Sequence, residues 1–334
     1  LIRAIKLAVP TLRKMQTYDE DIDSVKWFNW SGYPMDLQIL FKSNWEQWEE
    51  QVEFIQNEIT DGQIAAAFAE LPEAAQDESI EEIKENLKGR RGNLMEIARE
   101  YYEHMKEFTV ITGTIEDEEF EIQRKANGKT EIVQISESKE IFRHTYNSSE
   151  TKEIWIYGMD GDDTFHVTGA GDDLLKINVL GGPGEDIYNF QNKKKVKLYD
   201  FKSSENEIVQ PGSRKLLVDS YEINNFYYKK FKYSTFKALP YANFETDLGF
   251  ALGAEAIWTK YGLVNNPFQA QHELLANYYY DTNGFSIRYL GEFAHLFYNW
   301  NFGITARYTS PNYTLNYFAS GNETEYFRNE VDND

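Results

Sequence analysis

The feature that most constrains the fold is a regular alternation of apolar with polar or small residues over the last hundred positions. Four stretches show it, at 247–258, 268–280, 285–293 and 300–308. The apolar positions of the first stretch are Leu248, Phe250, Leu252, Ala254, Ala256 and Trp258. Because successive side chains of a β-strand point to opposite faces, each stretch predicts a strand with one apolar face. The Asn283-Gly284 pair between the second and third stretches predicts a tight hairpin turn.

The length of these stretches fits a membrane strand. Each has about the 9–11 residues that a tilted strand needs to cross a bilayer, and Tyr and Trp gather near the stretch ends, as in an aromatic girdle. The polar positions carry charges that suit a water-filled lumen: Asp247, Glu255, Arg288, Glu292 and Arg307. A soluble β-sandwich alternates in the same way, but the pattern favours strands of an outer-membrane barrel. Because the smallest such barrels have about eight strands, we expect the barrel to be incomplete in this chain.

The composition excludes some partners and some chemistry. The chain has 55 acidic and 34 basic residues, and its net charge of -21 would repel the phosphates of a nucleic acid. It has no cysteine, which excludes disulfides and thiol chemistry. The sequence contains no run of about 18 apolar residues, so it does not predict a membrane-spanning helix. The sequence has no zinc-type histidine pair, G-x-S-x-G motif or P-loop, so we identify no catalytic residue in it.

Residues 1–108 have the periodicity of amphipathic helices. Trp45, Trp48 and Val52 recur at intervals of three and four residues. Thr60 with Gln63 has the spacing of a capping box at a helix start, and so has Ser43 with Glu46. From residue 109 the period changes to two, so 109–157 predicts a small antiparallel sheet with a hairpin at 126–129. We therefore expect an α+β arrangement in which this sheet packs on the helices.

Residues 158–213 are rich in Asp and Gly. Segment 181–189 fits the calcium-binding nonapeptide G-G-x-G-x-D-x-U-x, and segment 158–166 fits it with one glycine replaced. The two copies begin 23 positions apart, which favours stacked β-arches over a nine-residue calcium roll. Carboxylates are good Ca²⁺ ligands, although Asp also forms tight turns for purely structural reasons. The candidate calcium ligands are Asp160, Asp162, Asp163, Asp172, Asp173 and Asp186.

Several segments together resemble a region of large envelope proteins of the Bacteroidetes type. They are 65–72, 87–94, 98–102, 151–165 and 181–186. The resemblance implies a calcineurin-like metallophosphoesterase domain upstream of residue 1. It also implies a C-terminal β-barrel of the bacterial surface antigen family, in the outer-membrane insertase superfamily. Segment 311–324 is similar to a loop of that barrel, although Ala319 and Ser320 depart from the F-G-x-G-N-x-T pattern. The chain lacks the phosphoesterase signatures, so no catalytic residue is carried over.

These observations lead to one expected function and two alternatives. We expect a segment of an outer-membrane β-barrel protein that contacts the lipid of the bacterial outer membrane and other envelope proteins. It would anchor or display the upstream metallophosphoesterase, or assist envelope assembly. The alternatives are a secreted calcium-binding β-rich adhesion module and a non-catalytic soluble part of a hydrolase. The expected regions are a helical module (1–108), a small antiparallel sheet (109–157), β-arches (158–213), a linker (214–235) and transmembrane β-strands (236–334).

Overall fold

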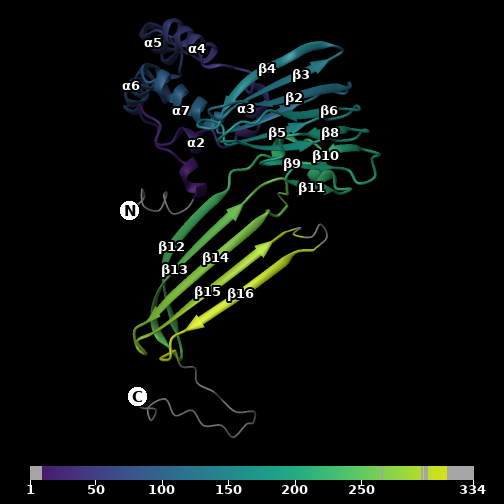
Figure 1. The fold of residues 1–334 in the computed structure, drawn as a ribbon. Coiled ribbons are helices and arrows are strands. Elements are labelled where there is room, and N and C mark those ends of the chain that lie inside the picture. Colours follow the sequence, from purple (N-terminus) through teal and green to yellow (C-terminus); the bar gives the residue numbers. More distant parts are fainter. Residues whose placement is uncertain (1–9, 265, 295, 297–299, 314–334) are drawn as a thin grey trace. The chain divides into compact units, whose positions relative to one another are not determined.

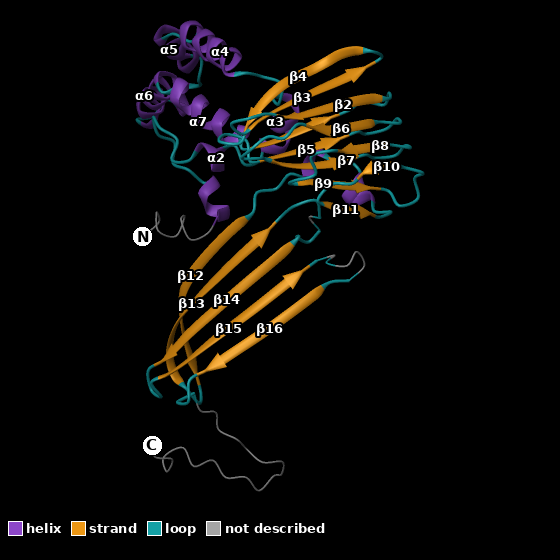
Figure 2. Ribbon diagram, in the orientation of Figure 1, coloured by secondary structure: helices purple, strands orange, loops and turns teal. Residues whose placement is uncertain are grey.

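The computed structural model of the chain describes residues 10–264, 266–294, 296 and 300–313 (Figure 1). Segment 314–324, part of the region that resembles a barrel loop, lies outside these residues. The chain divides into two compact units, one formed by Lys14–Phe231 and one that contains the strands after Lys232. The structure is mixed α+β, as the sequence predicts at this level, and the strands of the described residues form three sheets (Figure 2).

Most helices of the first unit precede its strands. They are α2 (Val25–Phe28), α3 (Tyr33–Ile39), α4 (Trp45–Glu58), α5 (Asp61–Ala69), α6 (Ser79–Gly92) and α7 (Leu94–Lys106), with the 3-10 helix η2 (Glu73–Ala75). The 3-10 helix η1 (Pro10–Lys14) ends at the residue where this unit begins. The buried face of α7 includes Tyr101, Tyr102 and Met105. Trp48 of α4 lies against both tyrosine rings, at 6.2 and 5.7 Å between centroids. These aromatic contacts hold α4 on α7. Of the predicted apolar stripe of α4, Val52 is buried and Trp45 and Trp48 are half-buried.

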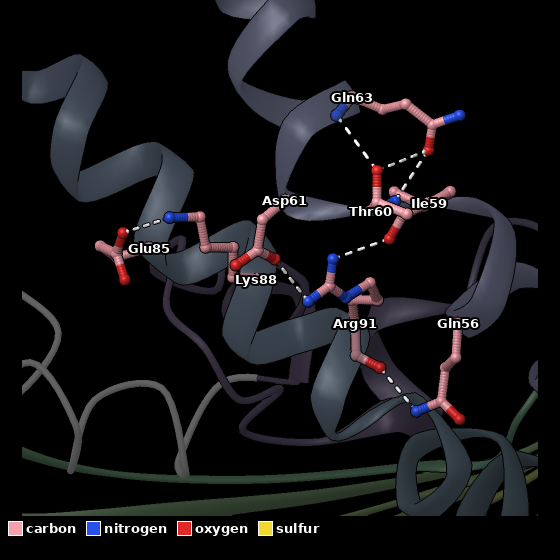
Figure 3. Close-up of polar contacts among 8 residues, drawn as sticks. All are labelled: Gln56, Ile59, Thr60, Asp61, Gln63, Glu85, Lys88 and Arg91. Carbon is pink, nitrogen blue, oxygen red and sulfur yellow. Dashed lines mark hydrogen bonds and ion pairs between the residues drawn. The ribbon is translucent and has the colours of Figure 1, made fainter.

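Polar contacts fix the corner between α4, α5 and α6 (Figure 3). The hydroxyl of Thr60 accepts from the Gln63 N–H, and the Gln63 side chain accepts from the Thr60 N–H, which is the predicted capping box. Arg91 of α6 donates to the carbonyl of Ile59 and to the carboxylate of Asp61, each at 2.7 Å. Arg91 thereby satisfies a carbonyl at the end of α4 and pairs with a charge in the first turn of α5.

The cap of α4 lies one residue later than the sequence predicts. Asn44 accepts from the Gln47 N–H, and the Gln47 side chain accepts from the Asn44 N–H, both at 3.0 Å. The Ser43 hydroxyl instead donates to the Leu40 carbonyl and accepts from the indole N–H of Trp48. Because its hydroxyl is engaged there, Ser43 is not available as the cap.

Strands β1 to β11 form two sheets whose inner faces share one core. The first sheet is parallel, in the order β1 (Phe108–Thr112), β5 (Glu153–Tyr157), β7 (Lys176–Leu180), β9 (Val196–Asp200), β11 (Arg214–Leu217). The second has the order β10 (Glu207–Gln210), β8 (Ile187–Phe190), β6 (Thr164–Thr168), β2 (Glu118–Arg124), β3 (Lys129–Ser136), β4 (Lys139–Asn147). From β5 onward successive strands alternate between the sheets, so each pair of strands adds one coil of a two-sheet β-solenoid.

The core of the solenoid consists of columns of equivalent side chains that run from coil to coil. Phe120, Phe165 and Tyr188 are register partners on β2, β6 and β8, and their rings stack at 4.9 and 5.3 Å between centroids. In the parallel sheet, Ile154 is the partner of Ile177. All five are fully buried. Because every coil buries the same positions, the stack tolerates turns of different length between strands.

Residues 109–157 do not form a single antiparallel sheet. β2, β3 and β4 are antiparallel as predicted, and the hairpin at 126–129 has Asn127 and Gly128 at positive φ, as its tight turn requires. In contrast, β1 and β5 pair in parallel within the other sheet. A period of two shows which side chains share a face, but it does not show which strand lies alongside.

Segment 214–235 is largely folded against the solenoid, where the sequence predicted a linker. β11 extends the parallel sheet, and α8 (Tyr221–Asn224) and η3 (Tyr228–Lys230) follow it. Phe226 lies against Tyr157, and Phe231 lies against Trp155, at 5.3 and 5.6 Å between ring centroids. These aromatic side chains cover the outer face of the parallel sheet, which would otherwise expose Trp155 and Tyr157.

The second unit contains an antiparallel sheet in which neighbours in space are neighbours in sequence (Figure 1). Its strands are β12 (Thr235–Glu245), β13 (Gly249–Lys260), β14 (Ala270–Tyr279), β15 (Gly284–Phe293) and β16 (Phe302–Thr309). Asn283, at φ 50°, lies in the predicted hairpin turn. The alternation did not single out β12, in which Leu239 and Tyr241 lie on the polar face and blur the pattern. Leu248 is fully buried in the turn before β13, so the exposed apolar face of that strand begins at Phe250 and not at Leu248.

Candidate functional site

One face of the five-stranded sheet is apolar across all its strands. Register partners share a face, so the face follows from the pairing: Phe250 pairs with Phe244, and Leu252 pairs with Ala242 and Tyr278. This apolar sheet face consists of Phe236, Ala238, Pro240, Ala242, Phe244, Phe250, Leu252, Ala254, Ala256, Trp258, Ala270, His272, Leu274, Ala276, Tyr278, Phe285, Ile287, Tyr289, Gly291, Phe293, Phe302, Ile304, Ala306 and Tyr308. Lys260, at the end of β13, is the register partner of Ala270 and belongs to the same face, so among the described residues the strongly polar side chains of this face are His272 and Lys260.

The large side chains of the apolar sheet face are exposed. Leu274, in the middle of β14, keeps 46% of its surface accessible, and Phe236 and Ile304, on the two outer strands, keep 56% and 44%. Within the described residues nothing covers this face, unlike the outer face of the parallel sheet. Contiguous apolar patches of more than a few hundred Å² are rare on soluble monomers and mark interaction or membrane surfaces.

The opposite face of the same sheet is polar and internally hydrogen-bonded. The Tyr241 hydroxyl donates to the Asn277 side chain, which lies two strands away. Arg288 pairs with Glu273 at 3.2 Å, and the Tyr279 hydroxyl donates to Glu245 at 3.2 Å. The contacts link neighbouring and next-but-one strands, so they hold this face together without another layer of protein.

His272 lies within an aromatic cluster on the apolar sheet face. Its ring stacks on Trp258 at 5.3 Å between centroids, and its Nδ1 lies 2.7 Å from the Tyr289 hydroxyl. The edge of Phe293 meets the same imidazole at 5.4 Å. The hydrogen bond satisfies one ring nitrogen, which lowers the cost of placing a histidine on an apolar surface.

The Asp/Gly turns of the solenoid form a ladder of hydrogen bonds from coil to coil. Asp163 Oδ1 accepts from the Glu118 N–H at 2.9 Å, and Asp186 Oδ1 accepts from the Asp163 N–H at 2.8 Å. Asn206 Oδ1 continues the ladder by accepting from the Asp186 N–H at 2.8 Å. The four residues are equivalent in the register, so each turn satisfies a backbone donor of the coil before it.

A second ladder runs beside the first, one position earlier in each turn. Asp117 accepts from the Asp162 N–H, and Asp162 accepts from the Glu185 N–H, both at 2.8 Å.

Glycine leaves room for the carboxylates of the first ladder. A Cβ on Gly181 would lie 2.0 Å from Asp186 Oδ2, and a Cβ on Gly158 would lie 2.1 Å from Asp163 Oδ2.

Burial sets the electrostatics of the first ladder. Asp163 and Asp186 are almost completely buried, and burial, reinforced by repulsion from Asp186, raises the pKa of Asp163 to about 8. Burial also raises the pKa of Asp186, with Asp200 adding to the effect. Within the described residues Asp163 Oδ2 has no hydrogen-bond partner. A protonated carboxyl therefore suits this position better than a carboxylate at neutral pH.

The six predicted calcium ligands do not form one set. Asp163 and Asp186 belong to the first ladder, and Asp160 and Asp162 are exposed in the same turn as Asp163. Asp172 and Asp173 lie at the opposite end of β6, where they accept from the Gly128 N–H and the Ser148 hydroxyl. No group of three or more acidic or histidine side chains in the described part of the chain is arranged to hold a metal ion. Calcium binding remains a prediction.

Four further residues belong to this site although the sequence pattern did not predict them: Glu118, Tyr188, Asp200 and Asn206. Tyr188 donates to Asp186 at 3.0 Å and to Asp200 at 2.6 Å. A signal for the ladder does exist in the sequence: Gly113, Gly158 and Gly181 are each followed, five positions later, by Glu118, Asp163 and Asp186. The nonapeptide pattern does not reveal this repeat, because Gly113 is followed by neither of the two further glycines of that motif.

Comparisons of the chain with protein-family models, with curated proteins and with solved structures found no match. Among the described helices, none combines the length and the apolar character needed to cross a bilayer.

Proposed function

We propose that β12–β16 belong to an outer-membrane β-barrel, and that the chain is an anchor for other domains at the bacterial outer membrane. The observation that supports this proposal is the apolar sheet face, which extends over all five strands and is exposed on each of them. Its polar counterpart, with Arg288, Glu273 and Asn277, would line the lumen.

The length of the strands agrees with this assignment. β14 and β15 have ten residues each, which at about 3.4 Å per residue span roughly 34 Å. A tilt of about 40° reduces this span to roughly 26 Å, close to the apolar band of about 25 Å in outer-membrane barrels. In the described chain β12 and β16 each pair with one strand, so each has one open edge. Open edges are costly in lipid. Closure of the barrel therefore needs further strands.

The resemblance to Bacteroidetes-type envelope proteins suggests what the barrel anchors. In this proposal the barrel belongs to the bacterial surface antigen family and displays a metallophosphoesterase domain, or takes part in envelope assembly with other envelope proteins. The helical module and the solenoid would then form the connector between that domain and the barrel. This part of the proposal rests on the resemblance, because the described residues hold no catalytic constellation.

Adjacent leucines on β14 provide the test. Leu274 lies on the apolar sheet face, whereas Leu275 lies opposite Glu255 and Arg288 on the polar face. In the chain refolded with lipid vesicles, Leu274→Arg should cost about 2–4 kcal/mol if the residue faces mid-bilayer, and should reduce co-flotation with the vesicles. Leu275→Arg should float like the unchanged chain. Equal flotation of both variants would contradict the proposed orientation.

A further inference from the structure

The two strongly polar side chains of the apolar sheet face lie at the same end of it. Lys260 ends β13, and His272 lies near the start of β14, the neighbouring strand. Because Lys260 is the register partner of Ala270, it lies diagonally across from His272, at about 7–8 Å. At the opposite end of the face the side chains are aromatic: Phe244, Phe250, Tyr278 and Phe285. The face therefore carries its cationic side chain at one end only.

Three side chains at this end keep hydrogen-bonding capacity that the described residues do not use. Lys260 is exposed, and no other described residue forms an ion pair or a hydrogen bond with its ammonium group. His272 uses Nδ1 for the Tyr289 hydroxyl at 2.7 Å, which leaves Nε2 without a partner in the described chain. Trp258 is exposed and stacks on His272 at 5.3 Å, and its indole N–H is likewise unpaired there. Three polar groups are thus available on two adjacent strands.

The position of these side chains along the strands corresponds, in the proposed barrel, to the edge of the hydrocarbon. Lys260 and Phe250 lie ten residues apart on β13. At about 3.4 Å per residue and a tilt of about 40°, they are separated by roughly 26 Å along the membrane normal. The apolar band of an outer-membrane barrel is about 25 Å tall. With Phe250 at one interface, Lys260 lies at the other, where the phosphate groups of the lipids begin.

We propose that Lys260, His272 and Trp258 bind the phosphate group of an anionic membrane lipid. The ammonium group pairs with the phosphate, and the imidazole and the indole donate hydrogen bonds to its oxygens. When the Tyr289 hydroxyl donates to Nδ1, the proton of the imidazole lies on Nε2 and is available to the phosphate. The acyl tails lie along the apolar sheet face below. This inference rests on the proposed function, because it requires that face to contact lipid.

The test is the enrichment of an anionic lipid beside these residues. Leu274→Cys, at the next position of β14 on the same face, carries a fluorophore, and the full chain is reconstituted in phosphatidylcholine vesicles with a minor share of phosphatidic acid. Bromine on the tails of the phosphatidic acid quenches the label, so the quenching measures how much of this lipid lies next to it. We expect an enrichment of about fivefold over the bulk share, the effect of one lysine on anionic lipid. Brominated diacylglycerol, which lacks the phosphate, should not be enriched, and equal behaviour of the two lipids would overturn the inference.

Variants separate this site from the general charge of the protein. Lys260→Met should remove most of the enrichment, and His272→Phe, which keeps a ring beside Trp258, should remove part of it. Lys237→Met is the matched control, because Lys237 lies at the same end of the sheet but pairs with Ile257 on the polar face. It should retain the enrichment, and equal losses from Lys237→Met and Lys260→Met would contradict a site on the apolar sheet face. Inorganic phosphate at constant ionic strength should leave the enrichment unchanged. Its loss would indicate a site for the free anion instead of a lipid.

Quenching by brominated phosphatidylcholine in the same preparation keeps this inference apart from the membrane assignment. A label that no brominated lipid quenches would contradict both. A label that phosphatidylcholine quenches, without enrichment of phosphatidic acid, would contradict the lipid-phosphate site alone.

Discussion

Phe165 of the solenoid and Leu274 of the five-stranded sheet occupy equivalent places in an alternating strand, yet Phe165 is fully buried and Leu274 keeps 46% of its surface exposed. In the solenoid the inner columns of two sheets bury each other, and Phe226 and Phe231 cover one outer face. The apolar sheet face has no such cover in the described chain. The same two-residue period thus produces a protein core in one unit and an open apolar surface in the other.

In the proposed membrane assignment, the two units are built for different solvents. A protein core stabilises the fold because each Å² of apolar surface removed from water contributes about 25 cal/mol. It therefore requires a second layer of protein. A membrane strand has no such requirement, because lipid is its second layer. The comparison can therefore be tested by substitutions that act on one unit only.

The largest expected effect is the loss of an aromatic ring from the solenoid core. Phe165→Ala should lower the free energy of unfolding of the solenoid by about 3–5 kcal/mol, because Phe165 stacks between Phe120 and Tyr188. Urea denaturation with amide exchange of β6 measures this. Phe285→Ala, on the apolar sheet face, should leave the solenoid unchanged. A comparable loss from Phe285→Ala would mean that both apolar surfaces belong to one core.

A smaller effect is expected at a glycine of the ladder. In Gly181→Ala the new methyl group would lie 1.9 Å from the Tyr188 hydroxyl and 2.0 Å from Asp186 Oδ2. We expect a destabilisation of about 1–3 kcal/mol, as for other overpacked sites. The control is Gly303→Ala in β16, where a Cβ meets nothing within 4 Å. If thermal unfolding showed both substitutions to be neutral, the glycines of the turns would have no packing role.

The stability of the solenoid should also depend on pH. The pKa of Asp163 is raised in the folded chain to about 8, above the unfolded value of about 3.9. The folded state therefore binds the proton more tightly, and this contribution is fully present below about pH 4 and is lost as the pH rises through 8. Because one unit of pKa corresponds to about 1.4 kcal/mol, we expect the free energy of unfolding of the solenoid to fall by up to about 5 kcal/mol over that range.

Asp163→Asn provides the matched variant for this prediction. An amide oxygen can still accept from the Glu118 N–H, as Asn206 accepts from the Asp186 N–H two rungs further along. The variant should therefore fold and should lose much of the pH dependence in urea titrations between pH 5 and 9. An unchanged pH profile would show that Asp163 is not the group that titrates.

Local features of the sequence were sufficient to predict much of the fold. The capping box at Thr60 and the hairpins at 126–129 and 281–284 depend on short-range chemistry, and the structure contains them. The alternation placed the apolar residues of β13 on one face because a strand has a fixed period. These features need no knowledge of distant partners.

Features that depend on distant partners could not be predicted in this way. The parallel pairing of β1 with β5 joins segments about forty residues apart, and no local signal reports it. Ser43 fails as a cap because Leu40 and Trp48 engage its hydroxyl. The candidate calcium ligands do not come together, because Asp172 and Asp186 lie at opposite ends of the solenoid strands. Only the stacking of the coils determines these positions.

The most direct test of the central claim uses the absence of cysteine from the chain. Single cysteines are introduced at each position from Glu273 to Asn277 and labelled with an environment-sensitive fluorophore in lipid vesicles. If the apolar sheet face contacts hydrocarbon, quenchers attached to lipid tails should quench the label at positions 274 and 276 and spare 273, 275 and 277. Quenching at every position alike, or at none, would contradict the assignment of β12–β16 to a membrane barrel.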